Sequence, residues 1–283
     1  AGESPRARLE VGWAPGGVRH RARDGRESPL AEHLAVQPVL AWTAAESALF
    51  GGPPAVRRRF LDRALVAWRP ASLETLARYG RALAAKRALL ADGRREGLEA
   101  WNELLAREGA TLVAARAELV AALAEELAPL LDTAGVAPLG LGLAYRPSPE
   151  AALGGEAALF EALSTATARE LRRGAPLLGP HRDDVELRMA EREARRVASA
   201  GERKALGLLL LAAQARLLAR RGRRPLLLLD DADTELDSAR LMAVWTALGE
   251  PEQLLATSNR PEVWAALPLA GRFCVEAGEV VRG

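Results

Sequence analysis

The chain has 283 residues, 49% hydrophobic and 27% charged, with a net charge of +2. This balance is typical of a globular protein with a substantial core and only a slight preference for anionic partners. No apolar run approaches the roughly 20 residues of a membrane-spanning helix, and residues 1–8 lack the apolar stretch of a secretion signal. Cys274 is the single cysteine, so an internal disulfide is excluded and a reducing cytoplasm is the expected location.

The first 70 residues predict short strands followed by a helix. Residues 6–11 alternate between polar and apolar side chains, which indicates a half-buried strand, and residues 39–42 form a second strand candidate. The Gly-Gly-Pro-Pro run at 51–54 then interrupts the chain before a basic helix over residues 55–68.

A heptad pattern begins after residue 72. Leucines recur every seven residues at 76, 83 and 90, and again at 98, 105, 112 and 119, with a break at Asp92 and Gly93. Two heptad helices joined by a short break predict an antiparallel helical hairpin. The hairpin is either a compact helical lobe or a short projecting arm, because the heptads are too few for a long coiled coil.

The carboxyl part predicts an α/β arrangement. Helices are expected over 156–173 and 199–221, and an antiparallel strand over 185–189. The apolar run at 226–229 is typical of a strand covered on both faces. A helix over 238–248 and a strand over 254–257 complete a βαβ unit.

Two acids follow the apolar strand directly. A parallel strand would fix Asp230 and Asp231 at the carboxyl edge of the sheet, where open α/β sheets bind ligands. Asp230 is then a candidate for holding Mg²⁺ and Asp231 for orienting an attacking water, as in a Walker B element. The alternative is a strand that ends in a solvated acidic turn.

A serine–glycine turn precedes the helix before that strand. Ser199 and Gly201 lie where the free N–H groups and the dipole of a helix favour an anion. The alternative gives Ser199 only the role of a helix cap, with Glu202 completing a capping box. The position of the turn, one helix before the paired acids, favours the anion site.

This order of motifs resembles the SMC-like branch of the ABC ATPases, and several stretches narrow the resemblance to the RecF family. The resemblance covers the chain from near its start to about Asn259. The stretches that carry it are Gly-Pro-His-Arg-Asp-Asp at 179–184, Ser-Ala-Gly-Glu-Arg-Lys at 199–204, Asp-Asp at 230–231, Thr-Glu-Leu-Asp at 234–237, Gly-Pro-Pro at 52–54, Arg-Arg-Arg-Phe-Leu-Asp at 57–62 and Trp-Asn-Glu-Leu-Leu at 101–105.

The resemblance implies a fold and a function. The fold is an α/β P-loop NTPase of the ABC/SMC head type with an inserted α-helical hairpin lobe. Residues 1–70 and 171–283 would form the head and residues 71–170 the lobe. The implied activity is a weak DNA-dependent ATPase of DNA repair, replication and the SOS response, with ATP and Mg²⁺ as cofactors. It would dimerise with ATP and help load RecA on gapped or single-stranded DNA with RecO and RecR.

The resemblance also implies roles for individual residues. Asp230 and Asp231 are the catalytic pair, with Asp230 as the metal ligand. The nucleotide of the opposite subunit would be contacted in trans by Ser199, Gly201, Glu202 and Asp237. DNA contact by Arg57, Arg58 and Arg59 is weighed against a solvated surface, and His181 is expected to be buried or capping and not catalytic.

One part of the family pattern is absent. No GxxxxGK[ST] loop occurs, because Lys86 lies in a heptad helix and Lys204 follows the serine–glycine turn. We expect an amino-terminally truncated sequence that by itself neither binds ATP tightly nor hydrolyses it. A histidine switch is also missing, and the neutral Thr257 and Ser258 stand in that region. The alternatives are a DNA- or RecR-binding module without ATPase activity, or another SMC-like ATPase.

Overall fold

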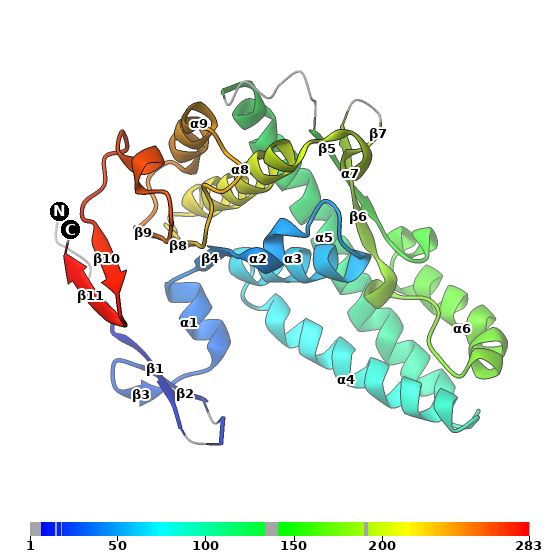
Figure 1. Ribbon diagram of the computed structural model, residues 1–283. Helices are drawn as coiled ribbons and strands as arrows, with labels where there is room; N and C mark the ends of the chain where they lie inside the picture. The colour runs from blue at the N-terminus through cyan, green and yellow to red at the C-terminus, as the bar shows by residue number, and fades with distance from the viewer. Residues whose placement is uncertain (1–6, 15, 18, 134–140, 190–191, 283) are drawn as a thin grey trace.

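The computed structural model describes residues 7–14, 16–17, 19–133, 141–189 and 192–282 (Figure 1). The strands are β1 (Leu9–Trp13), β2 (Arg19–Arg23), β3 (Arg26–Glu27), β4 (Val39–Trp42), β5 (Leu141–Arg146), β6 (Asp184–Met189), β7 (Arg192–Glu193), β8 (Leu226–Leu229), β9 (Gln253–Ala256), β10 (Phe273–Glu276) and β11 (Glu279–Arg282). The α-helices are α1 (Leu30–Val36), α2 (Ala44–Ser47), α3 (Pro54–Trp68), α4 (Ser72–Ala91), α5 (Leu98–Thr133), α6 (Glu156–Arg173), α7 (Ala194–Val197), α8 (Ala200–Ala219) and α9 (Ser238–Leu248). Short 3₁₀ turns are η2 (Glu150–Gly154), η3 (Pro180–Arg182) and η4 (Pro261–Trp264). Within these ranges no helix has the length and apolarity of a membrane span.

A three-stranded parallel sheet of order β4-β8-β9 lies at the centre of the head. The predicted βαβ unit is confirmed, because β8, α9 and β9 follow one another and β8 pairs in parallel with β9. The expectation that β8 is covered on both faces is wrong for the described part of the chain. Leu227 and Leu229 are buried, whereas Leu228 is 37% exposed and Leu255 on β9 is 52% exposed.

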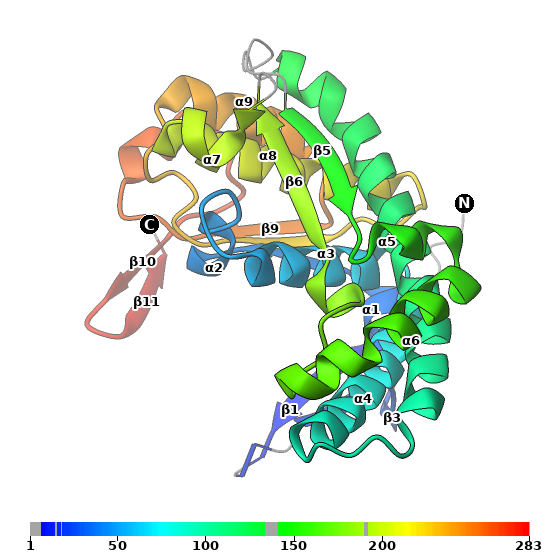
Figure 2. The same cartoon turned by 90° about the vertical axis from the view of Figure 1, so that its right-hand side faces the viewer.

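A second sheet is antiparallel, in the order β5-β6-β7. The strand predicted at 185–189 is present and begins one residue earlier. Its apolar residues Val185, Leu187 and Met189 are buried, as the period of two requires. Figure 2 shows this sheet standing between α8 and the helices of the lobe.

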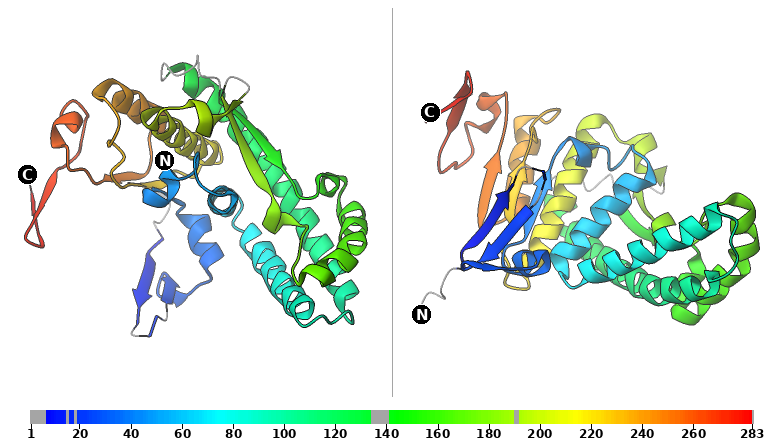
Figure 3. Two further views of the ribbon diagram at one scale, coloured as in Figure 1. Left: turned by 45° about the vertical axis from the view of Figure 1, so that its right-hand side comes forward. Right: turned by 90° about the horizontal axis from the view of Figure 1, so that it is seen from below.

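The predicted helical hairpin is formed by α4 and α5, and α6 packs beside both of them. These helices lie at one end of the molecule, whereas the β1–β3 sheet and the β10–β11 hairpin lie at the other (Figure 3). α5 has 36 residues and runs from the lobe into the head, where it packs against α8. Of the two alternatives, the structure favours a compact lobe joined to the head.

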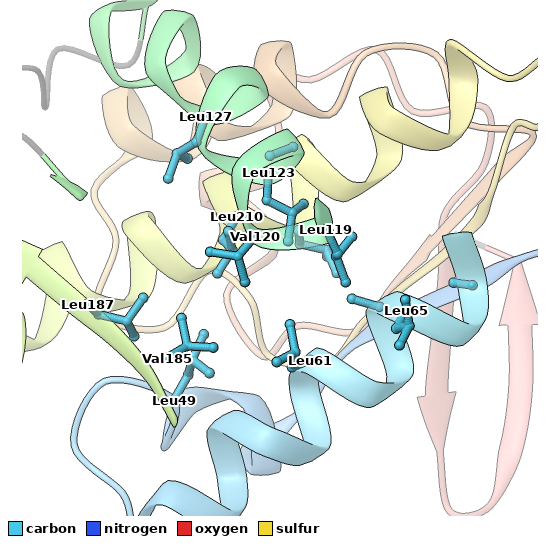
Figure 4. Close-up of a cluster of buried hydrophobic side chains, with 14 of the residues drawn as sticks. Leu49, Leu61, Leu65, Leu119, Val120, Leu123, Leu127, Val185, Leu187 and Leu210 are labelled. Carbon is cyan, nitrogen blue, oxygen red and sulfur yellow. The ribbon is translucent and has the colours of Figure 1, made fainter. Parts of the chain in front are cut away.

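One continuous hydrophobic core joins lobe and head (Figure 4). On α5, Leu119, Leu123 and Leu127 are buried in the same cluster as Leu65 of α3 and Leu210 of α8. The helical period of α5 brings these leucines onto one face. The lobe is therefore held by apolar packing along α5 as well as by the chain connections.

The hexapeptide at 179–184 lies where lobe and head meet. The carboxylate of Asp183 is fully buried and accepts hydrogen bonds from Arg116 Nη1 (2.8 Å), from the Tyr145 hydroxyl and from the backbone N–H of Ser148 (2.8 Å). The same arginine also pairs with Asp62 of α3 at 2.7 Å. The hexapeptide thus connects α3, α5 and β5.

His181 of the hexapeptide is partly buried behind α4. Its Nδ1 is hydrogen-bonded to the hydroxyl of Tyr79 at 2.9 Å. Burial, assisted by the positive charge of Arg182, lowers the pKa of His181 to about 4. This position agrees with the expectation of a buried histidine.

A fully buried ion pair lies inside the lobe. Lys86 Nζ of α4 is 2.6 Å from Glu170 Oε2 of α6, and neither side chain is exposed. The other oxygen of Glu170 accepts a hydrogen bond from the N–H of Leu177 at 2.7 Å. Lys86 therefore fastens α4 to α6, which accounts for a lysine inside a heptad helix.

We predict that Lys86→Met lowers the free energy of unfolding by about 3–5 kcal/mol, because the charge of Glu170 would remain buried without a partner. Urea unfolding followed by circular dichroism measures the change. The exposed pair Arg224–Glu250 provides the control, and Arg224→Met should change the free energy by at most about 1 kcal/mol. Adding Glu170→Gln to Lys86→Met should restore most of the loss. Equal effects of the Lys86 and Arg224 substitutions would contradict the prediction.

We also predict an acid-sensitive step in stability from His181. Its folded-state pKa of about 4 lies below the ordinary 6.5, so its contribution is complete above about pH 6.5 and is lost as the pH falls toward 4. The expected loss is up to about 3 kcal/mol. The difference between the urea midpoints at pH 7 and pH 4.5 should be smaller in His181→Gln than in the wild type. His20→Gln, at an exposed histidine, should keep the wild-type pH dependence.

Candidate functional site

The paired acids lie at the carboxyl edge of the parallel sheet, where the sequence places them. Asp230 and Asp231 directly follow β8, and the N–H of Asp230 donates to the carbonyl of Trp42 at the end of β4 (2.9 Å). Both acids are exposed. Asp231 has a left-handed φ of +48°, which is uncommon for a residue other than glycine and is typical of constrained functional turns.

Thr257 follows β9 and lies beside both acids. Its hydroxyl donates to Asp230 Oδ1 at 2.6 Å and accepts from the N–H of Asp231 at 3.2 Å. The sequence predicted a neutral hydroxyl in this region that hydrogen-bonds without carrying a proton, and Thr257 has the geometry for that role. The orientation of the Asp230 carboxylate is therefore fixed by the neighbouring strand.

The loop over residues 230–237, which we call the acidic loop, is held from the β9 side by polar contacts. Asp233 is fully buried and its Oδ2 accepts from the Ser258 hydroxyl at 2.7 Å. Arg260 Nη1 donates to the carbonyls of Asp233 (3.0 Å) and Leu236 (3.3 Å). These bonds fix the path of the loop backbone.

Lys204 holds the acidic loop from the opposite side. This buried lysine of α8 donates through Nζ to the carbonyl of Asp231 (2.6 Å) and to the Thr234 hydroxyl. Burial lowers the pKa of Lys204, while the carboxylates of Glu235 and Asp233 oppose that shift. The backbone of the acidic loop is therefore hydrogen-bonded by two cations, Lys204 of α8 and Arg260 of the segment after β9.

The serine–glycine turn forms the start of α8. Ser199 is exposed, and its hydroxyl accepts from the N–H of Glu202 at 3.3 Å, while Glu202 Oε2 accepts from the N–H of Ser199 at 2.7 Å. This reciprocal capping box lowers the pKa of Glu202. The capping alternative is thus realised, and Ser199 also lies where another molecule can reach it.

Gly201 is placed differently from its neighbour. It is buried, and a Cβ at this position would lie 2.7 Å from the carbonyl oxygen of Glu235. Gly201 therefore permits close approach of α8 and the acidic loop of the same chain. Asp237, also predicted to contact nucleotide in trans, is exposed and caps α9 by accepting from the N–H of Arg240 at 2.8 Å.

The arginines predicted as DNA contacts are mostly engaged within the chain. Arg57 forms a two-pronged pair with Asp184 (2.6 and 2.8 Å), and Arg58 Nη1 donates to the carbonyl of Asp183 at 2.9 Å. Only Arg59 of the three is exposed. Two of these arginines thus hold the hexapeptide, and DNA contact stays a prediction for all three.

Sequence reasoning missed the two cations that hold the acidic loop. Lys204 belongs to the stretch at 199–204 that carries the family resemblance, but nothing in that stretch indicates a role in holding the loop, and Arg260 lies in no motif. The contacts of Lys204 join residues 27 and 30 positions apart, and no periodic pattern marks them. The one available signal was Lys204 itself, a charged residue on the otherwise apolar face of α8.

The comparisons with known proteins concern the fold. No sequence-family profile matches the chain. The structure of the recombination mediator protein RecF-ATP in the RecFOR pathway is 21% identical, with a TM-score of 0.82 over 98% of this chain and 78% of that one. RecF-ATPrS of the same pathway, also 21% identical, gives a TM-score of 0.81 over 97% and 76%. An SMC head bound to the C-winged helix domain of ScpA is more distant, at 12% identity and a TM-score of 0.45.

These likenesses show the class of fold and the particular fold of the chain. The chain has the mixed α/β architecture of an ABC-type ATPase head with a helical lobe. Its particular fold is that of RecF, as the sequence resemblance implies, and the chain spans about three quarters of the RecF structures that it matches.

We predict that Gly201→Ala destabilises the protein by about 1–3 kcal/mol, because its Cβ requires the acidic loop to move away from α8. Gly80→Ala is the matched control, since Gly80 lies inside α4 with open space around its Cβ position. That substitution should stabilise by about 0.5–1 kcal/mol. Opposite signs in urea unfolding are expected, and a neutral Gly201→Ala would show that the close approach is unimportant.

Proposed function

We propose that this chain acts as a RecF-type, ATP-dependent DNA-binding protein in recombinational repair, replication and the SOS response. The observation that carries the proposal is the pair of acids at the carboxyl edge of the sheet, positioned by Thr257 and joined to the serine–glycine turn through the acidic loop. The RecF fold over nearly the whole chain supports the assignment. By the same resemblance its partners would be RecO and RecR, with which it would help load RecA on gapped or single-stranded DNA.

The paired acids suit the metal of a nucleotide site. Mg²⁺ is commonly held by one or two carboxylates together with substrate phosphates. Among the described residues no group of three or more His, Cys, Asp or Glu side chains could hold a metal ion. The donor set therefore fits Mg²⁺ shared between Asp230 and a nucleotide better than a protein-only metal cage. When bound, the ion would neutralise charge on the phosphates.

The residues of this chain would divide the remaining work. Asp231 would orient the attacking water, and Thr257 would hold the carboxylate of Asp230 in place. Ser199, with the positive end of the α8 dipole, would face the terminal phosphate of a nucleotide bound to a second copy. Lys204 and Gly201 join that turn to the acidic loop of the same copy. The position of Ser199 against the partner's phosphate would therefore be fixed relative to Asp230 and Asp231 of its own copy.

A second candidate is a DNA- or RecR-binding module that works without nucleotide. The observation that favours it is the lack of a glycine-rich phosphate loop within the 283 residues. Without such a loop the β- and γ-phosphates have no backbone cradle.

We predict that the 283-residue chain hydrolyses no ATP above background with Mg²⁺ and DNA present. A protein that carries these residues together with a glycine-rich loop encoded upstream should dimerise with ATP and Mg²⁺ in sedimentation experiments. Ser199→Arg should weaken that dimer at least about 10-fold, because the arginine fills the space for the partner's phosphate. Ser164→Arg, at an exposed serine of α6, should leave it unchanged.

The outcomes separate the two candidates. Dimerisation that survives Ser199→Arg would remove the trans role from this turn. A protein with the glycine-rich loop that ignores ATP would favour the nucleotide-free module.

A further inference from the structure

An arginine-lined hollow of about 300 Å³ lies at the carboxyl end of α6, in the helical lobe. Its lining residues are Arg169, Arg172, Arg173 and Leu177. All three arginines are exposed. α6 lies apart from the β4-β8-β9 sheet (Figures 1 and 2), so the hollow at its end is separate from the sheet edge that carries the paired acids.

The three arginines occupy one face of the helix. Positions 169, 172 and 173 are related by three and four residues, so their Cβ atoms are neighbours about 5–6 Å apart. The C-cap of α6 is Gly174, which has a left-handed conformation. Cations in the last turn also interact favourably with the dipole of this helix. That effect explains cations at the helix end, but it does not require three on one face around a hollow.

No acid of α6 is paired with this face. Glu170, the acid nearest in sequence, points inward and is paired with Lys86. Glu161 lies eight residues earlier on α6, about 12 Å along the helix axis. In the described part of the chain none of the three arginines forms an ion pair.

The neighbouring hexapeptide adds to the same positive field. Arg182 is exposed and donates to the carbonyl of Pro176, one residue before Leu177 of the hollow. Arg182, Arg87 and Arg58 each contribute to the lowered pKa of His181, after the larger effect of burial. Arg182 therefore adds a further exposed arginine next to the hollow.

The lining selects among anionic partners. Binding of single-stranded nucleic acid relies on aromatic side chains for base stacking, and none of the described residues that line the hollow is aromatic. A protein interface needs a buried apolar or aromatic anchor, whereas among the same lining residues Leu177 alone is apolar. Guanidinium groups in a row suit successive phosphates of a duplex backbone.

We propose that this arginine-lined hollow binds phosphates of the duplex DNA backbone, so that the helical lobe contacts DNA at a site distinct from the paired acids. The proposal rests on the DNA-binding function proposed above and adds the surface that performs it. Because phosphates carry no base identity, the contact is independent of sequence.

The test is fluorescence anisotropy of two labelled 30-base-pair duplexes of unrelated sequence, titrated with the 283-residue chain at several salt concentrations. Arg172→Gln/Arg173→Gln should weaken binding at least about 10-fold and equally for both duplexes. The slope of log affinity against log salt should fall by about one for each phosphate that the protein no longer neutralises. The neutral glutamines keep the helix, and an unchanged urea midpoint would confirm it.

The matched control is Arg23→Gln/Arg26→Gln, which removes the same charge from two exposed arginines of the β1–β3 sheet, at the other end of the molecule (Figure 3). It should retain wild-type affinity within about 3-fold. If both double variants weaken binding equally, net charge explains the effect and the proposal is overturned. A wild-type chain that binds no duplex would instead contradict the proposed DNA-binding function itself.

Two further measurements distinguish the ligand. A labelled 30-nucleotide single strand should bind more weakly than the duplex, and equal binding with an equal effect of the arginine substitutions would overturn the duplex assignment. Polyglutamate should compete poorly with the duplex at equal charge concentration. Effective competition that disappears in Arg172→Gln/Arg173→Gln would assign the hollow to an acidic protein.

Discussion

The buried carboxylate of Asp183 connects the two parts of the molecule. A carboxylate without solvent requires hydrogen bonds to most of its lone pairs, and Asp183 receives them from Arg116, Tyr145 and the Ser148 backbone. Each donor comes from a different segment, so satisfying one acid fixes the relative positions of α5, β5 and the hexapeptide. Arg116 extends the same network to Asp62 of α3. The apolar core along α5 then packs in a register that these polar contacts define.

At the sheet edge, charged side chains again hold separate segments together through hydrogen bonds, but here the charged groups are two cations. The acidic loop has no regular secondary structure to order its backbone, and its carbonyls are bound by Lys204 from one side and by Arg260 from the other. Removing either cation would break hydrogen bonds that tie these carbonyl groups to α8 or to the segment after β9, which is unfavourable. The exposed acids Asp230 and Asp231 can therefore stay solvated while the backbone that carries them is fixed. Such a rigid support is what a metal or phosphate site requires.

Much of this arrangement could be predicted from the sequence, because it depends on periodicity. The helices over 156–173 and 238–248 and the strands over 39–42 and 226–229 have the predicted bounds. The paired acids at the sheet edge followed from the same strand. The helix α5 was predicted to contain its heptads but not its length, since the series of leucines at 98, 105, 112 and 119 stops there and Glu126 takes the next position.

What the sequence could not supply were contacts between distant segments. Arg57 and Arg58 look like a solvent-facing basic cluster until the hexapeptide, more than 120 residues later, is placed beside them. The clamp by Lys204 and Arg260 likewise depends on tertiary structure. An unbroken apolar run such as 226–229 is also compatible with one covered face or two, and Leu228 shows that the pattern does not distinguish them.

The length of α5 has a mechanical consequence. Thirty-six residues at about 1.5 Å each form a rod of about 54 Å, with one half in the lobe and the other against α8. A rod of that length pivoting by about 5° moves its far end by about 5 Å, so a small repacking under α8 becomes a large displacement at the tip of the lobe. Glu126 of α5 pairs with Arg220, the residue that follows α8, so the base of this rod is tied to the carboxyl end of α8, about 30 Å along the helix axis from Ser199.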